Sequence, residues 1–115
     1  MKLIIAGGRN FTDYDLLKSK IDRILSKTES VEVVSGGARG ADALGERYAK
    51  ERSHPCAIFP AEWDKYGRSA GYIRNKQMAQ YATHLIAFWD GKSKGTKHMI
   101  TLANEYALKV RVVRV

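Results

Sequence analysis

Glycine and arginine residues cluster at a point where the chain could bind a phosphate group. Gly36 and Gly37 follow an apolar stretch directly, and Arg39 and Gly40 come soon after. Glycines ahead of a helix let backbone N–H groups approach an anion closely, and the helix dipole adds roughly half a positive charge there. An arginine side chain matches the geometry of phosphate oxygens. This segment therefore predicts an anion-binding loop.

Two further segments carry similar chemistry. Gly95 and Thr96 begin the most regular helical stripe of the chain, and the threonine hydroxyl is a further hydrogen-bond donor. The segment Gly7-Gly8-Arg9 follows the first apolar stretch, and Arg74 lies in a later helical stretch. Two helix starts together with several arginines favour a phosphorylated ligand over glycines that serve only tight turns.

Three well-defined catalytic or nucleotide-binding motifs are excluded because their spacing or their sequence context does not match. Gly91-Lys92-Ser93 resembles the end of a P-loop, but Ile86 stands where the first glycine is required. The stretch from Gly91 to Gly95 matches the G-x-S-x-G elbow of hydrolases, but the only later histidine, His98, is on the next helix. The glycine loop lacks the G-x-G-x-x-G spacing of dehydrogenases. The histidines are dispersed, so we expect no metal and no cofactor.

Short apolar stretches alternate with longer amphipathic stretches along the chain. Strands are predicted near residues 3–6, 31–34, 57–59, 85–88 and 110–115, with helices between them, including one over about 72–82. Such alternation is typical of a parallel sheet with helices on both faces. We therefore predict one α/β domain over residues 1–115. The glycine segments all follow strands, at the edge where open α/β sheets bind ligands.

The composition indicates a globular protein with an excess of positive charge. The chain has 115 residues, 44% hydrophobic and 28% charged, with a formal net charge of +8. Residues 61–115 carry ten basic and four acidic side chains, against ten and eight in residues 1–60. A basic surface attracts nucleotides, nucleic acids or anionic membranes. With one cysteine and no apolar stretch near ~18 residues, we expect a cytoplasmic protein without membrane contact.

The glycine and arginine segments together resemble those of the SLOG superfamily. The resemblance is carried by Gly7-Gly8-Arg9 with Phe11, the stretch Val34–Asp42, Arg74-Asn75 and Gly95-Thr96. The chain is most similar to the YspA-like, YpsA-related branch over almost its whole length. The resemblance implies a Rossmann-like sheet of five parallel strands in the order 3-2-1-4-5, with a crevice between strands one and four. It also implies a nucleotide-derived ligand there, such as an ADP-ribose-type molecule, that is sensed or sequestered.

The expected ligand-binding residues combine the loops with this resemblance. They are Gly7, Gly8, Arg9, Ser35, Gly36, Gly37, Arg39, Gly40, Asp42, Arg74, Asn75, Gly95 and Thr96. Asp42 could bind ribose hydroxyls, or only cap its helix and face Arg39. Trp63 or Tyr66 could cover the base, or both could only pack the loop that holds them.

A second hypothesis is an N-glycosidase that acts on a nucleotide. The chain is also similar to the lonely-guy phosphoribohydrolases, whose arginine and glycine loop match Arg74 and Gly95-Thr96. Met99 stands where that family has its glutamate, and the residue after Arg74 is not the family's lysine. A thioether cannot stabilise positive charge that develops on a ribose. On this hypothesis Glu62 or Asp64 would have to supply the carboxylate.

A third hypothesis is a single-stranded DNA-binding module. The DNA-processing protein DprA has a SLOG-like domain that binds single-stranded DNA through a similar glycine-rich segment. In this chain, basic residues interleave with aromatic residues only around residues 63–68. We therefore expect a small nucleotide-derived partner ahead of nucleic acid. The lonely-guy relatives dimerise, so a homodimer is a further hypothesis.

Overall fold

A five-stranded sheet forms the centre of the molecule, in a computed structural model that describes residues 1–26 and 30–115. The strands are β1 (Lys2–Gly7), β2 (Glu32–Ser35), β3 (Cys56–Ile58), β4 (His84–Trp89) and β5 (Lys109–Arg114). They lie in the order β3-β2-β1-β4-β5, and every neighbouring pair is parallel. The predicted α/β class and strand order are both confirmed.

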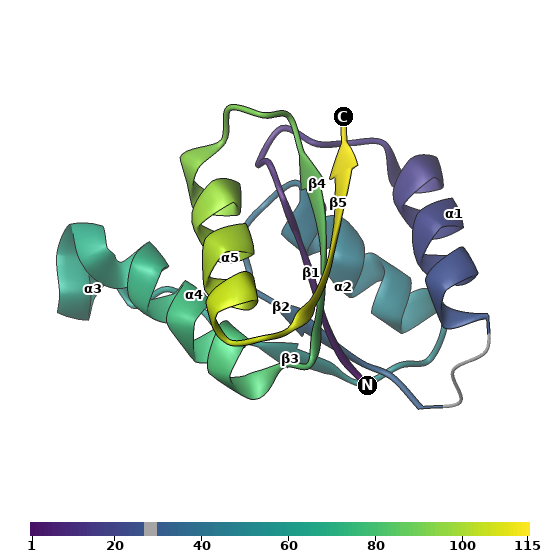
Figure 1. Ribbon diagram of the computed structural model, residues 1–115, viewed down its shortest axis with the longest axis horizontal. Helices are drawn as coiled ribbons and strands as arrows, with labels where there is room; N and C mark the ends of the chain where they lie inside the picture. The colour runs from purple at the N-terminus through teal and green to yellow at the C-terminus, as the bar shows by residue number, and fades with distance from the viewer. Residues whose placement is uncertain (27–29) are drawn as a thin grey trace.

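Helices cover both faces of this sheet, as predicted. α1 (Tyr14–Leu25) and α2 (Ala41–Glu51) pack on one face, while α4 (Ala70–Tyr81) and α5 (Lys94–Glu105) pack on the other (Figure 1). In β1, Leu3 and Ile5 point toward α1 and α2, whereas Ile4 and Ala6 point toward α4 and α5. Because both faces are covered, the central strands are continuously apolar rather than alternating with polar residues.

The segment between β3 and α4 is more helical than its residues predict. The sequence indicates a long loop followed by a helix from about residue 72. The structure instead has the short helix α3 (Trp63–Tyr66), a 3-10 turn (Gly67–Ser69) and α4 from Ala70 onward. No residue of α3 is buried, so α3 has no apolar periodicity that a sequence reading could detect. α3 projects from the N-terminal end of α4 (Figure 1).

Candidate functional site

Two adjoining cavities open at the carboxyl ends of the strands. The central cavity, of about 540 Å³, lies between the ends of β1 and β4. The lateral cavity, of about 360 Å³, lies between the glycine loop after β2 and the segment after β3. Arg9, Ala38 and Arg74 line both cavities, so the two meet at these residues. Both volumes suit a small ligand, because such sites typically measure about 300–1,000 Å³.

Glycines let the loop after β1 approach α2 closely. A Cβ at Gly7 would lie 2.6 Å from the carbonyl oxygen of Phe88 and 2.7 Å from the Cβ of Ala41. Gly40 has a φ of 78°, and a Cβ there would collide with the carbonyl oxygen of Gly8. That same carbonyl accepts the N–H of Ala41 at 3.2 Å. The chain itself therefore uses the first amide of α2, which the sequence suggested for a phosphate.

The loop after β2 is held largely by its own hydrogen bonds. Gly37 donates its N–H to Ser35 Oγ at 3.1 Å, and Ala38 donates its N–H to Asp42 Oδ2 at 3.2 Å. Ser35 is fully buried, and its hydroxyl donates to Glu46 Oε2 at 2.7 Å. Two of the loop amides are thus already engaged. Ser35 holds the loop through its hydrogen bond with Gly37 and lines neither cavity.

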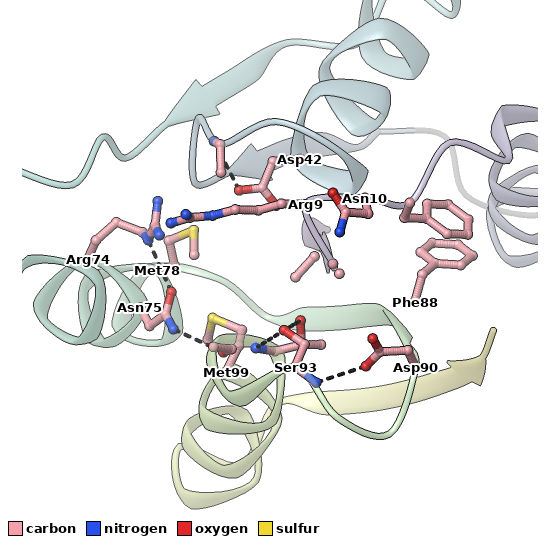
Figure 2. A pocket seen from close by; sticks show the side chains of 17 residues that line it. Arg9, Asn10, Asp42, Arg74, Asn75, Met78, Phe88, Asp90, Ser93 and Met99 are labelled. Carbon is pink, nitrogen blue, oxygen red and sulfur yellow. Dashed lines mark hydrogen bonds between the residues drawn. The ribbon is translucent and has the colours of Figure 1, made fainter.

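Two arginines approach each other where the cavities meet. Arg74 Nη1 donates to the carbonyl oxygen of Gly36, and Arg9 extends across the central cavity toward Arg74 (Figure 2). Burial lowers the pKa of Arg74, the negative charge of Asp42 acts in the opposite direction, and the positive charge of Arg9 lowers the pKa further. The ion pairs among the described residues, one within α2 and one between Arg52, which follows α2, and Asp22 on α1, include neither of these arginines. Two neighbouring cations of this kind favour binding of an anion.

Asp42 brings a carboxyl group to the central cavity. Burial raises its pKa to about 6, although the N–H of Ala38 and the charges of Arg74 and Arg9 act in the opposite direction. Ionisable groups with shifted pKa values in a cavity are frequent at functional sites. Arg39, the partner that the sequence suggested for Asp42, is exposed and lines the lateral cavity. The positive charges that act on Asp42 thus come from the other two arginines.

The start of α5 forms the opposite wall of the central cavity. Ser93 accepts the N–H of Thr96 at 3.5 Å, and the two hydroxyl oxygens are 3.0 Å apart. Asp90 Oδ1 accepts the N–H groups of Lys92 and Ser93, each at 2.8 Å, and these bonds lower the pKa of Asp90. No atom lies within 4 Å of the Cβ position of Gly95. Ser93 already accepts the N–H groups of Thr96 and Lys97. The N–H groups of Lys94 and Gly95 have no acceptor within the helix, so this end of α5 can receive an anion or a hydroxyl group.

Asn75 connects α4 to the start of α5. Its side chain is buried, and its Oδ1 accepts Arg74 Nε at 3.1 Å. Its Nδ2 lies 3.4 Å from the carbonyl oxygen of Gly95 and 3.1 Å from His98 Nδ1. Both ends of the amide are therefore engaged by the protein. Asn75 thus holds other residues of the site in place, and it also lines the central cavity, where the sequence predicts that it contacts the ligand.

The two candidates for the carboxylate of the N-glycosidase hypothesis lie outside both cavities. Glu62 and Asp64 are exposed and line neither of the two cavities. Tyr66 is also exposed and lines neither cavity. Trp63 does line the lateral cavity and is 52% exposed. Sequence reasoning missed several residues of the central cavity that follow β1 and β4 or lie on α4: Asn10, Phe11, Met78, Asp90 and Ser93. Their positions after strand ends were the available signal for most of them.

The part of the chain that the structure describes contains neither a membrane-spanning helix nor a metal-binding cluster. None of its helices is long and apolar enough to cross a membrane. Within residues 1–26 and 30–115, no three histidine, cysteine, aspartate or glutamate side chains are grouped so that they could hold a metal ion.

Comparison with solved structures supports the fold. The chain superposes on DNA processing protein A from Helicobacter pylori, whose structure was described for its single-stranded DNA binding mode, with a TM-score of 0.75. The match covers 97% of this chain and 64% of that one, at 19% sequence identity. This chain thus spans less than two thirds of that protein's chain, and at this identity the likeness concerns the fold alone.

Comparison with protein families and sequences identifies closer relatives. The model of the YspA, cpYpsA-related SLOG family matches residues 1–66, which include the first two glycine segments. The Gene 61 protein of Mycobacterium phage D29 is 31% identical over 119 residues, covering 95% of this chain and 93% of that protein. The chain therefore belongs to the YspA, cpYpsA-related SLOG family.

Proposed function

We propose that the protein binds a phosphate-bearing nucleotide or a nucleotide-derived ligand at the carboxyl edge of its sheet. The observation that carries this proposal is the approach of Arg9 and Arg74 at the junction of two cavities. A phosphate group between them would compensate two positive charges that repel each other and for which Asp42, with its pKa raised to about 6, is the nearby carboxyl group. Gly95, at the open start of α5, provides a second place for phosphate or ribose oxygens.

An ADP-ribose-type molecule is the finer form of this proposal. Such a ligand carries two phosphates and two sugars, and its length suits a site that consists of two joined cavities. Met99 lines the central cavity where the related hydrolases have a glutamate. This residue favours sensing or sequestration of the ligand over its hydrolysis.

The test is a titration of the purified protein with AMP, ADP-ribose, NAD and ribose 5-phosphate. Calorimetry gives the affinity, and chromatography of each mixture detects products. Arg74→Ala should weaken binding by roughly 10- to 150-fold, because a hydrogen bond to a charged group contributes about 1.5–3 kcal/mol. Arg23→Ala, an exposed arginine on α1, is the control and should leave the affinity unchanged.

Two results would contradict this proposal in different ways. Unchanged ligand affinity in Arg74→Ala would mean that the phosphate group does not bind between Arg9 and Arg74. Release of a free base from any nucleotide would show an N-glycosidase, and its carboxylate would then have to be sought at Asp42 or Asp90, which are the ones that line the central cavity.

Single-stranded DNA is the second candidate ligand. Its specific support is the groove that the two joined cavities form across the ends of several strands, on a fold shared with DNA processing protein A. A short oligonucleotide would then occupy the same arginine pair. Competition between a fluorescent oligonucleotide and ADP-ribose tests this: mutual displacement places both at one site, and oligonucleotide binding without any small-nucleotide binding would favour DNA.

A further inference from the structure

We propose that the lateral cavity is the base-binding subsite, so that the ligand extends across both cavities with its phosphates at their junction. This inference rests on the proposed function and assigns a direction to the ligand. It commits the ligand to one chemical class: a nucleoside diphosphate that carries a further group, such as a second sugar, on its terminal phosphate.

The walls of the lateral cavity suit a flat, partly apolar ring. Trp63, Pro60, Ala61, Gly36 and Gly37 line the cavity together with the exposed Arg39, besides the residues that it shares with the central cavity. The two glycines contribute no side chain, and Gly37 has a φ of 73°, which disfavours any other residue there. Aromatic side chains bind nucleobases by stacking, which works for any base because every base has a π face.

The indole of Trp63 is placed as a binding surface rather than as part of the core. It is 52% exposed, and α3 contributes no buried residue to the molecule. Its ring lies beside α4, since a Cβ added at Gly71 would be 3.6 Å from Trp63 Cη2. The ring is thus next to α4 and also lines the lateral cavity. A large aromatic ring placed in this way can stack on a ligand at a small cost in side-chain entropy.

The junction determines where the phosphates lie. Arg9 and Arg74 line both cavities, so a diphosphate bound by them has the lateral cavity on one side and the central cavity on the other. A base on Trp63 therefore directs the other end of the ligand toward Gly95 and Ser93 at the start of α5. A mononucleotide would fill the lateral cavity and the junction only, and would leave the central cavity empty.

The experiment compares three probes in Trp63 variants. The probes are ADP-ribose, ADP and ribose 5-phosphate, of which the last has no base. Trp63→Ala should weaken ADP-ribose and ADP by about tenfold, within the range of base–aromatic stacking, and should leave ribose 5-phosphate within about twofold. Trp63→Phe should restore most of the affinity. Tyr106→Ala, a similarly exposed aromatic residue beyond the far end of α5, should change nothing.

Tryptophan fluorescence gives an independent readout. ADP-ribose should quench the emission of the wild-type protein when its base stacks on Trp63. Trp63→Phe retains Trp89, the other tryptophan, and should lose this quenching while it still binds the probe. ADP-ribose should also bind more tightly than ADP, since only ADP-ribose reaches the central cavity.

The outcomes separate this inference from the proposed function. Equal weakening of all three probes in Trp63→Ala would assign Trp63 a structural role and overturn the base subsite. Unchanged ADP-ribose affinity in that variant would also overturn it, while binding that depends on Arg74 would keep the proposed function. If none of the three probes binds the wild-type protein, the proposed function fails and this inference fails with it.

Discussion

Asp42 is the residue at which opposing effects are most closely balanced. The N–H of Ala38 and two arginines favour its carboxylate form, but burial outweighs them and raises the pKa from 3.8 to about 6. Between these values the folded chain keeps a proton that the unfolded chain has lost. By linkage, the contribution of this group to the free energy of unfolding falls as the pH rises through that range. Asp42 therefore contributes less to the stability of the fold at neutral pH than at low pH, where its carboxyl group is protonated.

We expect Asp42→Asn to raise the free energy of unfolding at pH 7 by up to about 3 kcal/mol, because a pKa unit corresponds to about 1.36 kcal/mol. The amide avoids the buried charge, and its oxygen can still accept the N–H of Ala38. Urea denaturation at pH 7 and pH 4 measures the effect, which should fall to a small fraction of its pH 7 value at pH 4 because the folded carboxyl group is protonated there. Asp64→Asn, on the exposed α3, is the control. Destabilisation by Asp42→Asn at pH 7 would show that the arginines outweigh burial.

At the scale of elements, the geometry of the site depends on how α4 and α5 are held together. Asn75 on α4 contacts both the carbonyl oxygen of Gly95 and His98 on α5, and it also holds the guanidinium of Arg74. Tyr72 packs edge-on against His98, with ring centroids 4.6 Å apart, next to the same contact. The position of Arg74 therefore depends on the contact between the two helices.

Asn75→Ala should weaken ribose 5-phosphate binding by roughly two- to tenfold, the equivalent of one hydrogen bond. Since Asn75 acts through Arg74, the variant with both residues changed to alanine should bind no more weakly than Arg74→Ala alone. Calorimetry on the four proteins measures this coupling. Gln77→Ala, at an exposed position of α4, is the control. Fully additive losses would mean that Asn75 contributes to binding independently of Arg74.

Helices and strands could be predicted from the sequence where apolar residues recur at a regular spacing, but the contacts between elements could not. The apolar stretches that form β1 and β4 and the helical stripe of α5 could be predicted, because burial on one or both faces imposes a regular spacing. The approach of Arg9 and Arg39 followed from the strand order because they come after β1 and β2, whereas Arg74 lies on α4 and was assigned to the site by the family resemblance. The collision that requires glycine at position 40 arises from the loop after β1, so no local pattern reveals it. The partners of Asn75 depend on tertiary packing in the same way.

At the scale of the whole molecule, the excess of positive charge is larger than the site requires. Three arginines line the cavities: Arg9, Arg39 and Arg74. Other basic side chains lie on β5, at the edge of the sheet farthest from the lateral cavity. Lysine and arginine at an edge strand discourage pairing with other chains. The net charge of +8 therefore does not by itself indicate a nucleic-acid surface.

The salt dependence of binding distinguishes the two candidate ligands, because it counts the phosphates that the protein contacts. Single-stranded nucleic acid gives a log–log slope of roughly −0.7 for each phosphate contacted. A ligand held mainly by Arg9 and Arg74 involves about two phosphates and carries no condensed counterions, so the slope for ADP-ribose should be shallower than about −1.5. Titrations between about 50 and 200 mM salt measure it. A slope steeper than about −3 for an oligonucleotide, together with absent ADP-ribose binding, would mean that a strand crosses both cavities and reaches basic residues beyond them.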